Sequence, residues 1–302
     1  MKRLVGANGR APRELVLTRE EERRLLRDAR EGDAVALRRL LERVSPPIYR
    51  FGRGFCGDTE DAKDVMQEVL VSLVRSLPSI RGDSSITTWA YTVARRACAR
   101  QRRRSRDREM REPESGLEHV AAPEDRTSDP SREAERREVE TAVRDAILLL
   151  PPPQREAIVL RDLEGVSARE AARILRVSER ALKSRLHRAR LALRDALAGS
   201  LGETPPAGIP GSCPDAGRLL SRYLEGELNA RTCASMESHL RTCRSCGRAC
   251  RALKRSLTLC RRYGSRPLST AARKSLRGAI RGAIAESRSA PRSSRSSRSS
   301  RS

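Results

Sequence analysis

Apolar residues recur at three- and four-residue steps along residues 18–104, which predicts a block of helices. Thr18-Arg19-Glu20-Glu21 is a capping-box pattern that opens the first helix, and Gly32 closes it. We expect the second helix to end before Pro46-Pro47, because proline removes a helical hydrogen bond. The clearest apolar stripe belongs to a third helix, which starts near Asp58: Val65, Val69, Leu70, Leu73 and Leu77. A fourth helix ends in a run of arginines.

The same period returns over residues 136–199, with an interruption at Pro151-Pro152-Pro153. Proline is tolerated in a first helical turn, so a new helix can begin there. A capping box at Ser167 then opens a short helix, and a tight turn leads to a longer basic helix that Ser178 can cap. This layout predicts a helix-turn-helix unit that binds DNA. The polar face of its second helix offers the candidate contacts to bases and phosphates: Arg180, Lys183, Ser184, Arg185, His187 and Arg188.

Three stretches lack this period and divide the chain. Residues 105–135 form an acidic segment with several prolines, which predicts a flexible linker. Residues 200–211 are rich in Pro and Gly, and residues 286–302 are an Arg/Ser repeat that we expect to be disordered. We therefore expect an all-α protein with two small helical domains, 18–104 and 136–199, and a small helical domain over residues 212–285.

The net charge and the low aromatic content exclude several classes of function. The chain has 302 residues and a net charge of +24, but only 2% aromatic residues, too few for a large enzyme core or a rich ligand pocket. It has no apolar run long enough to span a membrane and no secretory signal, so we expect a cytoplasmic, non-enzymatic protein that binds nucleic acid. Residues 1–199 hold 42 basic and 33 acidic residues, a net charge of +9, so most of the excess lies beyond them.

Six of the eight cysteines fall between residues 213 and 260, which favours metal or redox chemistry over structural disulfides in the cytosol. His239, Cys243 and Cys246 have the H-x3-C-x2-C spacing of a zinc site. A tetrahedral site needs a fourth ligand, for which Cys213 is the best candidate and Cys233 the alternative. We predict one zinc ion, structural or sensory.

The segment DAKDVMQEVLVSLVRSLPSIRGDSSITTWAYTVARRACARQRRR resembles region 2 of the extracytoplasmic-function sigma factors of bacterial RNA polymerase. The resemblance implies that an acidic helix docks on core RNA polymerase through Asp61, Asp64, Gln67 and Glu68. It also implies that the following loop and helix bind the −10 element of promoter DNA, through Arg81, Ser84, Ser85, Trp89, Arg95, Arg96 and Arg100.

The segment from Leu150 to Leu193 resembles region 4 of the same family, which reads the −35 element. The Cys-rich segment, which follows a YLEGEL motif, is similar to the zinc-finger domain of zinc-binding anti-sigma factors. Together these resemblances imply a sigma factor with a fused zinc-finger domain that regulates it in cis, with or without a separate anti-sigma partner. The alternative is a metal- or redox-responsive helix-turn-helix regulator that does not act through core polymerase.

Overall fold

The computed structural model describes residues 18–80, 85–111, 130–200 and 213–289, and the part of the chain that it describes contains helices and no strand. This confirms the predicted all-α class. The first block consists of α1 (Arg19–Glu31), α2 (Ala34–Cys56), α3 (Thr59–Ser76), the short 3-10 helix η2 (Leu77–Ser79) and α4 (Ile86–Arg111). As predicted, Thr18 and Glu21 form a capping box at α1, and Gly32 ends that helix in the left-handed conformation, at φ 100°.

The prediction that Pro46-Pro47 would end the second helix is wrong, because α2 continues through both prolines to Cys56. A proline inside a helix costs roughly 3 kcal/mol or more. The residues that follow, among them Ile48, Phe51 and Phe55, are buried, and burial of each such side chain stabilises by about 1.5–3 kcal/mol. Packing of this segment therefore outweighs the cost of the prolines.

The second block consists of α5 (Pro130–Leu149), α6 (Pro152–Ile158), the π-helical turn η3 (Val159–Leu163), α7 (Ala168–Leu175) and α8 (Glu179–Ser200). As the sequence predicts, α7 and α8 form a helix-turn-helix, packed through Ala171, Leu175, Leu182 and Leu186. The segment predicted as a flexible linker overlaps the helices at both ends, since α4 continues to Arg111 and α5 begins at Pro130. The residues between them lie outside the described part of the chain.

The two blocks pack directly against each other and share one hydrophobic core. The buried Arg155 joins them, because its guanidinium donates to the carbonyl oxygen of Phe55 at 3.3 Å and to that of Leu150 at 3.1 Å. In addition, α4 of the first block packs on α7 of the second. The helix-turn-helix is therefore fixed against the first block.

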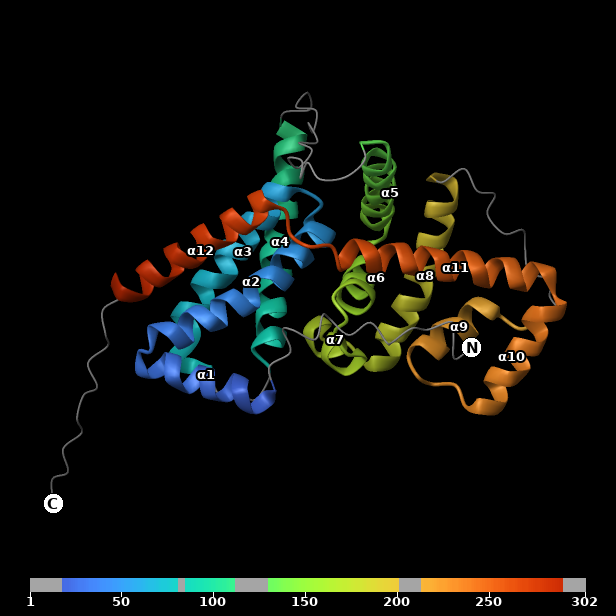
Figure 1. Ribbon diagram of the computed structural model, residues 1–302, viewed down its shortest axis with the longest axis horizontal. Coiled ribbons are helices and arrows are strands. Elements are labelled where there is room, and N and C mark those ends of the chain that lie inside the picture. Colours follow the sequence, from blue (N-terminus) through green and yellow to red (C-terminus); the bar gives the residue numbers. More distant parts are fainter. Residues whose placement is uncertain (1–17, 81–84, 112–129, 201–212, 290–302) are drawn as a thin grey trace, which may run out of the picture.

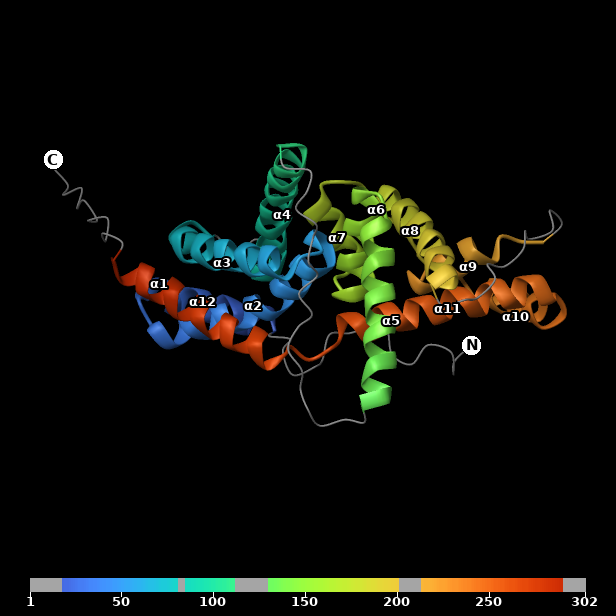
Figure 2. The same cartoon turned by 90° about the horizontal axis from the view of Figure 1, so that it is seen from above.

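The C-terminal region consists of α9 (Ala216–Leu224), α10 (Ala230–Thr242), α11 (Arg244–Gly264) and α12 (Thr270–Ser289), and it spans both blocks (Figures 1 and 2). α9 and α11 pack on α8 of the second block, and α12 packs along α3 and α2 of the first. The predicted domain 212–285 is thus divided between two docking sites. α12 also reaches Ser289, four residues into the segment that was expected to be disordered, and residues 290–302 lie outside the description.

None of the helices described is both long enough and apolar enough to cross a membrane.

Gly264 lies where the C-terminal region packs tightly on the backbone of the second block. A Cβ atom at this position would lie 2.8 Å from the carbonyl oxygen of Leu163 and 2.9 Å from its Cα. We expect Gly264→Ala to destabilise the protein by about 1–3 kcal/mol in urea unfolding, because backbone atoms must shift. Gly278→Ala is the matched control: nothing lies within 4 Å of that position in α12, so alanine should stabilise by roughly 0.5–1 kcal/mol. Equal unfolding midpoints for the two variants would contradict this contact.

Candidate metal and nucleic-acid sites

Four potential metal ligands meet in the C-terminal region. Cys213 precedes α9, His239 lies in the last turn of α10, and Cys243 and Cys246 lie at the start of α11. One ligand atom from each lies within 4.8 Å of the others. The structure therefore brings together the four residues predicted as ligands, whereas the alternative candidate, Cys233, is not part of the cluster.

The cluster fits a tetrahedral zinc ion. The sulfur atoms of Cys213 and Cys243 lie 3.8 Å apart, and two thiolates at about 2.3 Å from one tetrahedral ion would be separated by about 3.8 Å. The Nε2 atom of His239 is buried and has no hydrogen-bond partner among the described residues, as expected of a nitrogen reserved for a ligand.

The surroundings of Cys243 and Cys246 also shift the pKa values of their thiols. The backbone N–H of Cys246, at the start of α11, donates to the sulfur of Cys243 and lowers the pKa of that thiol. Burial, together with the neighbouring thiols, raises the pKa of Cys246 to about 12. A metal cation bound here would deprotonate the thiols that bind it.

The predicted −35 contacts on α8 divide into two groups. Arg180, Ser184 and Arg188 are exposed. Lys183 instead forms an ion pair with Glu227 of the C-terminal region. His187 is partly buried, and burial lowers its pKa although Asp215 of the C-terminal region opposes the shift. The C-terminal region thus occupies one side of the predicted DNA-binding face.

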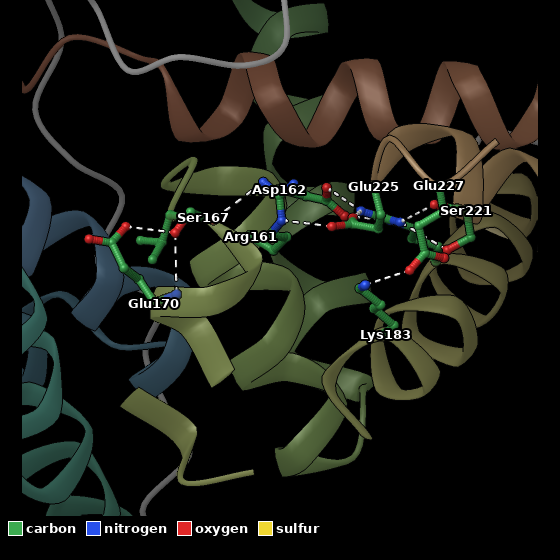
Figure 3. A network of polar contacts seen from close by, with 10 residues as sticks. Arg161, Asp162, Ser167, Glu170, Lys183, Ser221, Glu225 and Glu227 are labelled. Atoms are coloured by element: carbon green, nitrogen blue, oxygen red, sulfur yellow. Dashed lines mark hydrogen bonds and ion pairs between the residues drawn. The ribbon is translucent and has the colours of Figure 1, made fainter. Parts of the chain in front are cut away.

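A buried ionic network carries this contact (Figure 3). Arg190 of α8 has a side chain only 1% exposed, and its guanidinium donates to both carboxylate oxygens of Asp162 at 2.8 Å. It also donates to Ser221 Oγ at 2.9 Å and to Glu225 at 2.8 Å, both in the C-terminal region. Glu225 accepts a second bond, of 3.0 Å, from Arg161 Nε.

The network keeps its members charged. Burial disfavours the ionised form of Asp162, but the adjacent Arg190 outweighs it and holds the pKa of Asp162 below its usual value. The sequence analysis missed this site. A signal was present, because Arg190 follows Leu186 by four residues and precedes Leu193 by three, which places a cation on the apolar stripe of α8.

The residues predicted to dock on polymerase lie on one helix, α3. Asp64, Gln67 and Glu68 are exposed, and Glu68 forms an ion pair with Arg100 of α4. The Oδ1 atom of Asp61 accepts a hydrogen bond of 2.8 Å from the side chain of Gln101. The structure therefore leaves most of this acidic surface open and joins it to the cationic helix α4.

The predicted −10 contacts fall on α4 and the loop before it. Arg81 and Ser84 lie outside the described residues, and the hydroxyl of Ser85 accepts a bond of 3.1 Å from the backbone N–H of Thr88 at the helix start. Trp89 packs against the core, and Arg96 is exposed. Among the described positions, Arg96 and Arg100 are exposed four residues apart on α4, whereas Trp89 is partly buried.

Two acidic residues of the second block form ion pairs and hydrogen bonds with side chains of the first block. Glu156 forms an ion pair of 2.7 Å with Arg95, one of the predicted −10 contacts. Glu164 is buried and accepts hydrogen bonds from Arg50, at 3.2 Å, and from the hydroxyl of Tyr91, at 3.1 Å. Burial raises the pKa of Glu164, with Arg50 and Tyr91 opposing the shift. The side of α4 that was expected to hold DNA is therefore partly occupied by the second block.

Three protein families match this chain. "Sigma-70 region 2" matches residues 40–108, "Sigma-70, region 4" matches residues 140–193, and "Putative zinc-finger" matches residues 213–247. The third match contains all four residues of the metal cluster.

Among curated proteins, the RNA polymerase sigma-H factor of Pseudomonas aeruginosa is 31% identical over 199 residues, which cover 62% of this chain and 100% of that protein. The ECF RNA polymerase sigma factor SigM of Mycobacterium tuberculosis is 34% identical over 164 residues, 54% of this chain and 77% of the relative. Among solved structures, the sigma factor RpoE of Bartonella quintana, in complex with the anti-sigma factor NepR, aligns with a TM-score of 0.43 at 21% identity, over 58% of this chain and 98% of that one.

We expect Arg190→Ala to destabilise the full chain by about 3–5 kcal/mol, because it leaves Asp162 and Glu225 buried without their partner. The control is Arg188→Ala, which removes an exposed cation from the same helix and should change stability by no more than about 0.5 kcal/mol. Urea unfolding followed by circular dichroism measures both. If the two variants unfold at the same urea concentration, the network does not carry the contact.

We expect one zinc ion per chain in metal analysis of the purified protein, and a cobalt-substituted form with thiolate charge-transfer absorption. Cys213→Ser should lower this absorption, because it removes one of the three clustered thiolates, whereas Cys233→Ser should leave it unchanged. The reverse result would identify Cys233 as the fourth ligand.

Proposed function

The chain belongs to the extracytoplasmic-function RNA polymerase sigma factors, which bind core RNA polymerase and direct transcription initiation at promoters, and we propose that its C-terminal region inhibits this activity in cis. In this proposal the region acts as a tethered anti-sigma domain. The observation that carries it is that α9 and α11 dock on region 4 while α12 docks on region 2. One segment thus holds both DNA-reading regions together.

The distance between the −10 and −35 elements explains why this arrangement of regions 2 and 4 would inhibit promoter binding. The −10 and −35 elements are separated by about 25 base pairs, or ~85 Å of duplex at 3.4 Å per base pair. In this structure α4 of region 2 packs directly on α7 of region 4, and Arg95 reaches Glu156 at 2.7 Å. Because the two regions touch, they cannot reach both elements at once. Promoter binding therefore requires them to separate.

The contacts made by the C-terminal region also use the residues that the active form would need. Lys183, a proposed −35 contact, is paired with Glu227. α12 lies along α3, the helix that carries the proposed polymerase contacts Asp61, Asp64, Gln67 and Glu68, and Arg75 of α3 pairs with Glu286 of α12. Release of the C-terminal region would free Lys183 of α8, while Asp64, Gln67 and Glu68 are already exposed in the closed form.

In the same proposal, Cys213, His239, Cys243 and Cys246 hold one zinc ion. The ion would cross-link the segment before α9 to the α10–α11 junction. Asp215, two residues after Cys213, caps α9, which carries Ser221 toward Arg190. The metal site would therefore position α9, the helix that contacts region 4.

The alternative, a helix-turn-helix regulator that works without core polymerase, leaves the region 2 match over residues 40–108 without a role. We propose that the chain supplies binding and no catalytic group of its own, and that it works in the cytoplasm with the polymerase.

We expect Leu276→Asp with Ile280→Asp to release α12, because each change places a charge in the buried face of that helix. Single-round transcription with core polymerase should then rise by ~10-fold or more, since 1.4 kcal/mol of lost docking energy already corresponds to tenfold. Small-angle scattering should show a larger radius of gyration.

Arg277→Asp is the control, because it changes the net charge by the same two units on the exposed face of α12. A released, expanded double variant that transcribes no better than wild type would show that the C-terminal region does not inhibit.

A further inference from the structure

The α11 helix carries two opposed stripes. Its buried face is formed by residues at alternating steps of three and four: Cys246, Cys250, Leu253, Leu257, Cys260 and Gly264. A second stripe follows the same spacing on the exposed face, and five of its six positions are arginine: Arg244, Arg248, Arg251, Arg255, Thr258 and Arg262. The helix therefore presents a continuous cationic ridge to solvent.

No acidic residue balances this ridge from within its own segment. Residues 241–285 contain 13 Lys and Arg and no Asp or Glu. Among the nearby acids, Glu225 and Glu227 bind region 4, Glu286 pairs with Arg75, and Glu237 of α10 interacts with Arg241 and Lys254, which lie outside the ridge. Within the ridge, Arg255 itself interacts with another group of the chain. Like charges at adjacent turns of a helix repel each other and destabilise it. Ordinary protein surfaces mix both signs, so a ridge of one sign indicates an anionic ligand.

We propose that this α11 ridge binds the phosphate backbone of duplex DNA without regard to sequence. From Arg244 to Arg262 the ridge is about 27 Å long at 1.5 Å per residue, which matches about eight base pairs. DNA fits better than an acidic protein because protein interfaces need buried apolar or aromatic anchors, and phosphate contacts need only cations. Val35 and Leu149 are the exposed large apolar residues among those described, and neither lies on α11.

This inference is independent of inhibition in cis. The ridge faces solvent while α9 and α11 are docked on region 4, so the closed protein keeps a DNA-binding surface although Lys183 of α8 is occupied. The closed form would therefore be retained on the chromosome.

The test measures binding of the full zinc-loaded chain, without polymerase, to a fluorescein-labelled 25-base-pair duplex that contains no promoter. Fluorescence anisotropy gives the dissociation constant between 50 and 300 mM salt. The ridge variant is R248Q/R251Q/R262Q, and the matched control, R23Q/R27Q/R39Q, removes three exposed arginines from α1 and α2. Circular dichroism and zinc content verify that both are folded.

We expect the ridge variant to bind at least tenfold more weakly at 100 mM salt, and its salt slope to fall by about 3, since each phosphate contact contributes about 0.9. The control should change the slope by less than about 1. Equal losses in both variants would overturn the proposal, because bulk charge would then explain the binding. Failure of the wild-type chain to bind would also overturn it.

Discussion

The arrangement of this sigma factor depends on one buried cation, Arg190. Its guanidinium is enclosed between Asp162 of region 4 and Glu225 of the C-terminal region, so the two surfaces must meet in one register for every charge to find a partner. Desolvation of such a network cancels much of its Coulomb attraction, and a buried ion pair is therefore a weak source of net stability. The network specifies the docking geometry, and when the surfaces separate, water can solvate the exposed charges. Reversible docking at a defined position follows from this balance.

The other attachment of the C-terminal region has different chemistry. α12 is held on region 2 mainly by buried aliphatic side chains, including Leu276, Ile280 and Ala283. Debye screening by salt weakens interactions between exposed charges, whereas apolar burial carries no charge to be screened. The C-terminal region thus combines an apolar contact on region 2 with a polar, register-specific contact on region 4. In the proposed inhibition, both contacts would have to be released before regions 2 and 4 could separate.

The metal cluster takes no direct part in either contact. A bound ion would, however, affect the position of α9, which contacts region 4. Its ligands come from the segment before α9 and from the ends of α10 and α11, so a bound ion would hold these three helices as one unit. The exposed cations of α11 lie on the opposite side of that helix from the residues packed against region 4. Metal binding, docking and the proposed DNA contact therefore use different faces of the same short segment.

The sequence by itself determined the helices, the helix-turn-helix and the four clustered ligands, because apolar periodicity, capping residues and ligand spacing are local signals. It failed at Pro46-Pro47, where burial of Ile48 and Phe51 outweighs a local rule. Only the tertiary structure decided that Arg190 is buried, that Glu156 of region 4 pairs with Arg95 of region 2, and that α12 leaves the zinc-finger segment to pack on region 2. These contacts join residues far apart in the chain. Which acid meets which arginine is set by how whole helices pack, and no local pattern encodes that choice.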